Sequence, residues 1–286
     1  MRQLPNTTSV AWFDTTFHQT ISPSIYTFPV NQEIAKKHGL RKYGFHGISY
    51  SFILRNVAEF LKKVAFHLHR PYTRPLMFSE PTSTTSLIVL HLGSGASACC
   101  IKNGQSLDTS MSLTPLAGLP GATRSGSIDP MAILHVMKDS KISVDDAEDI
   151  LNKKSGWKSL TGTTSFGDIA KSKDADKRLA FDIFVDRVLD FIGAYYLKLG
   201  GQVDALVFAG GIGEKSPELR QAIASKCSCL GFQLYDGMNK SQDGAELAKT
   251  VRSISHGGKY ILVCETNEQF EMAYQCMKDD KLYSRD

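Results

Sequence analysis

The sequence predicts an α/β fold in which helices flank a mixed sheet, and three observations support this prediction. Short apolar runs alternate with segments of helical periodicity along the 286 residues, which is typical of α/β proteins. Asn103-Gly104 separates two runs of strand length, so we expect a tight hairpin and an antiparallel strand pair. Hydrophobic residues make up 42% of the chain and charged residues 22%, which is typical of a folded protein and excludes disorder as the main state.

The N-terminal part of the chain is expected to hold a strand and two helices. Ser9–Phe13 is a short apolar run and predicts a strand. Pro29–His38 predicts a short helix that ends before Gly39, a residue suited to the left-handed position after a helix. Amphipathic spacing predicts a longer helix over Ile48–Lys63. An irregular surface excursion is then expected from Pro71, Pro75, Pro81 and the run Thr82-Ser83-Thr84-Thr85-Ser86.

Apolar runs predict the remaining strands of the sheet. Leu87–Leu92 is apolar almost throughout, which indicates a strand buried on both faces. The hairpin strands are expected over Ala96–Ile101 and Gln105–Met111. Two further strands are predicted later in the chain, Asp204–Ala209 and Tyr260–Cys264.

Two helices of the central region are predicted from their first residues. Pro130 at a first helical position predicts a helix over Asp129–Met137. Ser143 with Asp146 three residues later has the spacing of a capping box, and Gly156 follows the end of that helix.

The C-terminal half is expected to contain the longest helix, Leu179–Leu199, and two later ones. Ser216-Pro217-Glu218 predicts the start of a helix, and Thr266 with Gln269 predicts a capping box for a last helix that runs to Lys278. The long helix carries an apolar stripe that we expect to be core and not a cofactor contact: Ala180, Phe184, Val188, Phe191, Tyr195 and Leu199.

Composition also excludes several classes of function. The net charge is +4 and no dense basic run occurs, so a dedicated nucleic-acid-binding protein is not expected. No apolar stretch approaches the roughly 20 residues of a membrane span, and no apolar segment of a secretory signal follows Met1. Six cysteines are too few for a disulfide scaffold, and Cys227-x-Cys229 has no second pair at zinc spacing. We therefore expect a cytoplasmic protein with reduced thiols.

Glycine-rich segments that follow apolar runs are the first candidates for chemistry. Glycine lets a phosphate approach backbone N–H groups closely, and a following helix adds a favourable dipole. One such segment alone is more often a tight bend, but three in one chain favour nucleotide or phosphate binding. None matches the Walker pattern. The segments are His91-Leu92-Gly93-Ser94-Gly95-Ala96-Ser97, Gly118-Leu119-Pro120-Gly121-Ala122-Thr123-Arg124-Ser125-Gly126, and Phe208-Ala209-Gly210-Gly211-Ile212-Gly213-Glu214.

Four ionisable residues stand in positions suited to such a site. Asp14 follows a predicted strand and could hold Mg²⁺, although a turn or cap residue would look the same. His46 lies in a turn between glycines, where a ligand contact and a hydrogen-bonded turn histidine are equally open. Arg124 lies inside a glycine turn, which packing explains poorly and recognition of a phosphoryl or carboxylate group explains well. Glu268 opens the last helix, where compensation of the helix dipole is the simple alternative.

Taken together, the motifs resemble the acetate kinase family, the acetate and propionate kinases of the sugar-kinase/actin/Hsp70 superfamily. They run almost from end to end in the order of that family: Phe13-Asp14-Thr15-Thr16-Phe17-His18-Gln19, Arg41-Lys42-Tyr43-Gly44-Phe45-His46-Gly47-Ile48-Ser49, His91 to Ser97, Asp108-Thr109-Ser110-Met111, Leu113-Thr114-Pro115-Leu116, Thr123-Arg124-Ser125-Gly126 with Ile128-Asp129-Pro130, Gly210-Gly211-Ile212-Gly213-Glu214, and Thr266-Asn267-Glu268.

The resemblance implies a ribonuclease-H-like, actin-type fold and reversible phosphoryl transfer between ATP and a short-chain carboxylate such as acetate. Arg124 and His46 would neutralise the transferred phosphoryl group, while Asp14 would act in catalysis and, with Glu268, would position Mg²⁺. His91 and the turn Gly93–Ser97, with Gly93, Ser94 and Gly95, would hold phosphate. The segment expected against the adenosine is Gly210, Gly211, Ile212, Gly213 and Glu214.

The same resemblance implies a division of the chain and a homodimer. Residues 1–18 would be a remnant of an N-terminal domain, 19–266 the nucleotide-binding domain, and 267–286 a helix that returns to the first domain. The family's N-terminal phosphate turn and carboxylate pocket find no match, since Asn6-Thr7-Thr8-Ser9 follows no apolar strand. We therefore expect weak or absent activity from this chain alone, because positioning of the acceptor contributes about 7–11 kcal/mol to such reactions.

Departures from the family pattern leave alternatives open. Phe166 and Asp168 stand where many members have an Asp and an Arg that contact the nucleotide, so the donor could instead be linked to pyrophosphate. Ser94 and Ser127 replace a common Asn and Asp. A non-catalytic module for nucleotide binding or dimerisation, and a kinase for another acyl group such as butyrate, are further alternatives.

Overall fold

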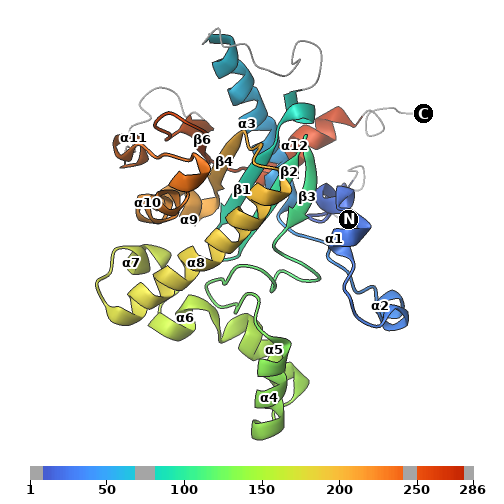
Figure 1. Ribbon diagram of the computed structural model, residues 1–286. Helices are drawn as coiled ribbons and strands as arrows, with labels where there is room; N and C mark the ends of the chain where they lie inside the picture. The colour runs from blue at the N-terminus through green and yellow to red at the C-terminus, as the bar shows by residue number, and fades with distance from the viewer. Residues whose placement is uncertain (1–8, 68–80, 241–249, 280–286) are drawn as a thin grey trace, which may run out of the picture.

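A single six-stranded sheet forms the centre of the computed structural model, which describes residues 9–67, 81–240 and 250–279 (Figure 1). The strand order is β3-β2-β1-β4-β6-β5. Strands β1, β4 and β6 run parallel, and the other neighbours are antiparallel, which confirms the predicted mixed sheet. The strands are β1 Leu87–Leu92, β2 Ala96–Lys102, β3 Gln105–Thr109, β4 Ala205–Ala209, β5 Val251–Ser253 and β6 Tyr260–Cys264.

Helices cover both faces of this sheet. The long helix α8 crosses one face, and α3 with α12 covers the other, while α4 and α5 lie beyond the end of the sheet (Figure 1). The α-helices are α1 Pro23–Tyr26, α2 Gln32–His38, α3 Gly47–His67, α4 Pro130–Ser140, α5 Val144–Lys153, α6 Gly156–Thr161, α7 Phe166–Ala170, α8 Ala175–Lys198, α9 Gly210–Lys215, α10 Pro217–Lys226, α11 Asp236–Lys240 and α12 Glu268–Lys278. Short 3-10 helices are η1 Thr16–Thr20, η2 Pro81–Thr84 and η3 Ser228–Leu230.

Two apolar cores lie on the two faces of the sheet. Side chains alternate between the faces along a strand, so Ile88 and Leu90 of β1 join the core under α8, while Leu87 and Val89 join the core under α3. The predicted stripe on α8 belongs to the first core, because its residues are buried except for Phe191, which packs against the same cluster.

The observed helix caps and the hairpin turn agree with several predictions. Gly39 ends α2 in the left-handed region with φ 63°. Asn103 and Gly104 have φ 49° and 78°, as the hairpin turn requires. Ser143 and Asp146 form the predicted capping box of α5, and Ser216 caps α10.

Other predictions were wrong. Ser9–Phe13 is not a strand, because it pairs with no strand in the described part of the chain and Phe13 is 67% exposed. Asn267, and not Thr266, caps α12 by accepting from the Phe270 amide. Gly156 begins α6 instead of following α5 directly. Most of the expected proline-rich excursion, together with Asn6-Thr7-Thr8, lies outside the described residues.

Three further observations concern membrane-spanning helices, cysteines and metal-binding clusters. No helix within the described ranges is both long and apolar enough to cross a bilayer. All six cysteines are unpaired, and Cys227 is buried while Cys229 is exposed. The same part of the chain holds no cluster of three or more His, Cys, Asp or Glu side chains that could bind a metal.

Candidate active site

The glycine segments meet at the carboxyl ends of the parallel strands, where ligands bind in open α/β sheets. The Ala122 amide donates to the Ser94 carbonyl at 2.8 Å and so joins the first segment to the second. A Cβ atom at Gly210 would lie 2.7 Å from the Leu92 carbonyl oxygen, so the third segment packs directly on the end of β1. The third segment is the short helix α9 and not a turn.

Two of the predicted residues, His46 and His91, stack on each other at this edge. Their ring centroids lie 4.2 Å apart at an interplanar angle of 24°. A Cβ atom added at Gly95 would lie 3.0 Å from Nη1 of Arg124 and 4.0 Å from Nε2 of His46. Arg124 and His46 therefore converge on the glycine turn that follows β1, and glycine at position 95 leaves the space between them open.

A chain of hydroxyl groups orients the His46 ring. Ser97 Oγ lies 2.9 Å from Nδ1 of His46 and also bonds the buried Tyr50 hydroxyl. If Tyr50 donates to Ser97, then Ser97 donates to Nδ1, and His46 carries its proton on Nε2. That N–H is directed toward Gly95 and Arg124, so the neutral ring can donate to an anion held there.

The His91 ring is fixed from α3. Ser49 Oγ lies 2.8 Å from Nδ1 of His91 and 2.8 Å from the Thr266 hydroxyl. Burial, and then the neighbouring His46, lowers the pKa of His91 to about 3. Burial, partly offset by Asp14, also lowers the pKa of His46. Both rings are therefore neutral at pH 7, so each can donate through one N–H, while Arg124 supplies the positive charge.

Asp14 and Glu268 form the acidic side of the site. The Asp14 carbonyl accepts from the Gly47 amide at 2.9 Å, which ties the start of α3 to the segment before η1. Burial, and then the charge of Asp14, raises the pKa of Glu268. A divalent cation between the two carboxylates would relieve the repulsion that, besides burial, raises the pKa of Glu268. Mg²⁺ usually binds one or two carboxylates and keeps several water ligands.

Helix α9 is held in place from beneath. Glu214 accepts from the Thr266 amide through Oε1 at 3.2 Å, and burial raises the pKa of Glu214. The Ile212 side chain is partly buried and packs against the core under α8. Arg220 of α10 is 2% exposed and donates to the carbonyls of Gly213 and Glu214, each at 2.8 Å. Burial lowers the pKa of Arg220 to about 10.

Arg220→Met is expected to lower the free energy of unfolding by about 2–4 kcal/mol, because buried oxygens would lose their donor. The oxygens include Oδ1 and the carbonyl of Asn239, at 2.7 and 2.8 Å. Urea unfolding followed by circular dichroism measures this change. Arg178→Met is the matched control on the exposed face of α8, with an expected change below about 0.5 kcal/mol. Equal effects of the two variants would contradict the role of Arg220.

Sequence reasoning missed the residues that orient the histidines. Ser97 was expected in a phosphate turn, but it lies in β2, is fully buried and bonds His46. Ser49 and Tyr50 lie in α3 and His18 lies in η1, and nothing in their local sequence indicates which groups they meet. Only the three-dimensional arrangement brings Ser49 to His91, Tyr50 to Ser97, and His18 to the loop before His46.

Two of the departures from the family pattern, Phe166 and Ser127, have structural roles. Phe166 is 5% exposed and packs edge-on against Trp157 and Phe184, so it belongs to the core. Ser127 Oγ accepts from the Gly118 amide at 2.9 Å and closes the second glycine turn. Asp168 lies in the first turn of α7 and is exposed.

Similarity to solved structures agrees with this geometry. An acetate kinase from Entamoeba histolytica superposes with a TM-score of 0.81 at 30% identity, covering 96% of this chain and 67% of that one. An acetate kinase from Porphyromonas gingivalis gives a TM-score of 0.79 at 29% identity, covering 95% and 63%. These likenesses confirm the expected ribonuclease-H-like, actin-type fold.

Curated relatives share a higher sequence identity with this chain than these two solved structures do. A probable acetate kinase of Emericella nidulans is 50% identical over 98% of this chain and 66% of its own length, and an acetate kinase of Leifsonia xyli is 39% identical over 96% and 64%. The chain therefore spans about two thirds of the length of these relatives. The model of the acetokinase family matches residues 1–274. The chain belongs to the acetokinase family.

Proposed function

We propose that the protein transfers the terminal phosphoryl group of ATP to acetate or another short-chain carboxylate, reversibly, in a cytoplasmic setting. The observation that carries the proposal is the convergence of Arg124 and His46 on Gly95, where the first two glycine segments meet. Membership of the acetokinase family and the similarity to acetate kinases support it. Phosphoryl transfer needs positioning and charge stabilisation more than covalent chemistry, and this site offers both.

Each residue of the site has a defined task in this proposal. Backbone N–H groups of Gly93, Ser94 and Gly95 bind the phosphates, and α9 lies against the adenosine. Arg124 donates to the oxygens of the transferred phosphoryl group, and the Nε2–H of His46 donates from the other side. The stacked His91 restricts the orientation of the His46 ring and borders the site on one side. A fixed ring helps to keep the attacking and leaving oxygens in line.

Asp14 and Glu268 would hold Mg²⁺, which fits two oxygen donors at an edge that also binds phosphates. When bound, Mg²⁺ neutralises negative charge on the phosphates.

Acyl-phosphate formation by the 286-residue chain tests the proposed function directly. Purified protein is incubated with ATP, Mg²⁺ and acetate, and acetyl phosphate is trapped with hydroxylamine. Turnover is expected to be weak, because the acceptor pocket of the family finds no match in this chain, but to exceed that of an Arg124→Ala sample. No turnover with any of acetate, propionate or butyrate, combined with no binding of ADP by calorimetry, would overturn the proposal. Tight ADP binding would also argue against a donor linked to pyrophosphate.

Mg²⁺ alone is expected to raise the melting temperature, with a midpoint that shifts to higher Mg²⁺ as the pH falls. The pKa of Glu268 is raised, so protons compete with the cation at a higher pH than for an ordinary glutamate. Thermal melts at several pH values, without nucleotide, measure this shift. Glu268→Gln should weaken the stabilisation by Mg²⁺ and reduce its pH dependence to what Asp14 alone contributes, whereas Glu59→Gln, on the exposed side of α3, should change neither. A response to Mg²⁺ and pH in Glu268→Gln equal to that of the wild type would rule out this assignment.

We also propose that the protein is a homodimer. Helix α4 has no buried residue and projects from the sheet, and Met131, Leu134 and Val136 expose apolar side chains on it (Figure 1). Three exposed apolar side chains on one short helix are typical of a surface that another protein covers, and we propose that a second copy of this chain covers it. Light scattering after gel filtration should give twice the monomer mass, and Leu134→Glu should lower it; a monomeric wild-type protein would contradict the proposal.

A further inference from the structure

The backbone of His46 has an unusual conformation. Its φ is +58°, in the left-handed region that residues other than glycine seldom occupy. Such a conformation persists only where neighbouring groups hold it. Because the ring of His46 must face Gly95, the groups that hold this backbone also determine where the ring points.

The Phe45 carbonyl is one of the groups that hold this backbone, besides the His46 carbonyl, which accepts from the Tyr50 amide at 2.9 Å. The angle φ of His46 describes the rotation between its own side chain and the peptide plane that carries the Phe45 oxygen. Nε2 of His18 lies 3.0 Å from that oxygen. This hydrogen bond therefore fixes the peptide plane on one side of the φ rotation of His46, and the bond from the Tyr50 amide to the His46 carbonyl holds the other side.

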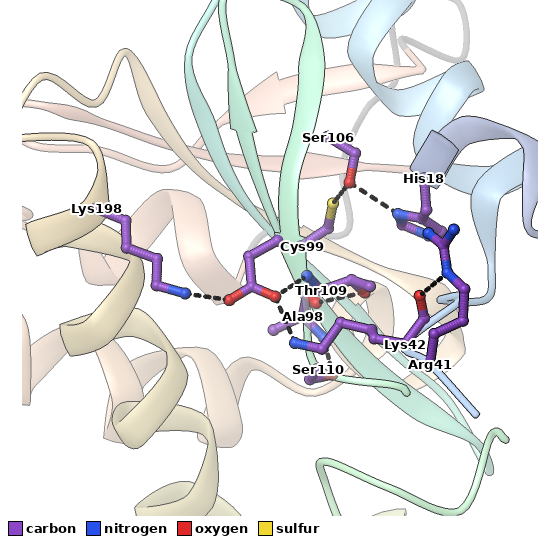
Figure 2. A network of polar contacts seen from close by, with 10 residues as sticks. His18, Arg41, Lys42, Ala98, Cys99, Ser106, Thr109, Ser110 and Lys198 are labelled. Carbon is purple, nitrogen blue, oxygen red and sulfur yellow. Dashed lines mark hydrogen bonds and ion pairs between the residues drawn. The ribbon is translucent and has the colours of Figure 1, made fainter. Parts of the chain in front are cut away.

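The His18 ring is itself confined. It is 1% exposed, and Nδ1 lies 2.8 Å from the Ser106 hydroxyl on β3 (Figure 2). A Cβ atom at Gly44 would lie 2.5 Å from Cδ2 of His18, so the ring lies directly on the backbone of the loop. The loop before His46 therefore rests on this imidazole, and glycine at position 44 permits the contact.

A bulge in β3 lets this strand reach both faces of the sheet. Ser106 pairs with Ile101 of β2, and Asp108 pairs with Cys100, so Leu107 is an extra residue. Ser106 consequently faces the α3 side, where His18 lies. Asp108 accepts from Lys42 at 2.6 Å and from Lys198 of α8, and Figure 2 labels both lysines. The loop that leads to His46 is therefore attached to β3 at Lys42 as well.

The hydrogen bonds define the protonation of His18. A carbonyl oxygen only accepts, so Nε2 carries the proton and Nδ1 accepts from the Ser106 hydroxyl. Burial lowers the pKa of His18 to about 4, which agrees with a neutral ring at pH 7.

We propose that His18 is a positioning residue for His46: its neutral ring, fixed by Ser106, holds the Phe45 carbonyl and so maintains the backbone conformation that directs the His46 ring to the reacting phosphoryl group. The effect on turnover rests on the proposed function, but the effect on the geometry of His46 does not. His18 itself contacts no reacting atom.

Kinetics of substituted proteins test the first part. His18→Leu removes the donor to Phe45 and should lower kcat by about 10²-fold with KM for ATP nearly constant, because a misplacement of about 1 Å has that effect. His18→Gln keeps an N–H donor and should recover at least about tenfold of this loss. Val188→Ala, in the core under α8, lowers stability without touching the loop, and its kcat should stay within about twofold of the wild type. Equal kcat in His18→Leu and wild type would overturn the proposal.

Histidine NMR tests the second part without any turnover. The rings of His46 and His91 shift each other's signals because they stack, and His46→Gln and His91→Gln variants assign these signals. His18→Leu and the milder Ser106→Ala should both move the His46 signals, and the double variant should behave like His18→Leu alone. Val188→Ala should leave these signals in place. Unchanged His46 signals in both single variants would overturn the proposal. A chain that shows these shifts but no acyl-phosphate formation would retain the positioning role and count only against the proposed function.

Discussion

Arg124→Ala should lower the rate of acyl-phosphate formation by about 10³–10⁵-fold, the range that a transition-state arginine contributes in phosphoryl transfer. His46 and His91 are neutral in the free site, so Arg124 is the group there that brings a full positive charge to Gly95. Removing it leaves the charge of the transferred group uncompensated. The hydroxylamine assay measures kcat, and calorimetry should give an affinity for ADP within about threefold of the wild type.

Two further variants make the Arg124 experiment specific. Arg124→Lys keeps the charge but loses the planar pair of donors, and its kcat should fall between those of the wild type and the alanine variant. Arg178→Ala removes an exposed arginine from α8 and should leave kcat unchanged. A loss of ADP binding as large as the loss of kcat would instead identify Arg124 as a ground-state binding residue.

Gly47→Ala should lower the free energy of unfolding by about 1–3 kcal/mol and abolish most activity. A Cβ atom at this position would lie 2.0 Å from the Asp14 carbonyl oxygen and 2.9 Å from Cβ of Phe17. The start of α3 must then move away from Asp14, and both His46 and the acidic side of the site move with it. Urea unfolding gives the change in stability, and the hydroxylamine assay gives the change in kcat.

Gly193→Ala is a control for which the free energy of unfolding should rise instead of fall. Gly193 lies inside α8 with no atom within 4 Å of an added Cβ, so alanine should stabilise the helix by about 0.5–1 kcal/mol. Its activity should match the wild type. Two glycine substitutions that change stability in the same direction would contradict the close approach at Gly47.

Local sequence patterns predict those elements whose formation depends on their own residues. Leu87–Leu92 has the predicted bounds, since an apolar run buried on both faces has few alternatives. The hairpin at Asn103-Gly104 and the cap at Ser143 follow from preferences of single residues. The prediction for Ser9–Phe13 failed because a strand needs a neighbour, and β5 escaped notice because it has three residues. Thr266 and Asn267 can both cap a helix, and the pattern alone does not distinguish them.

Some residues of the candidate site can likewise be predicted from the local sequence, and others cannot. Asp14, His46, Arg124 and Glu268 could be singled out because each is an ionisable residue in a turn or at a helix end. The hydroxyl groups of Ser49, Tyr50 and Ser97 could not, because a serine or tyrosine in a helix or strand becomes functional only through the group it meets across the fold. The assignments of roles to individual residues remain predictions that the experiments above address.

The extra residue in β3 limits how this strand can change during evolution. Ser106 and Asp108 would share one face of a regular strand, whereas Leu107 places them on opposite faces. Deleting Leu107 would shorten the hairpin by one position and leave either His18 or Lys198 facing the wrong side chain. We therefore expect the length of this edge strand to be preserved among homologues even where the residues around it vary, and tolerated insertions to fall at the hairpin tip instead.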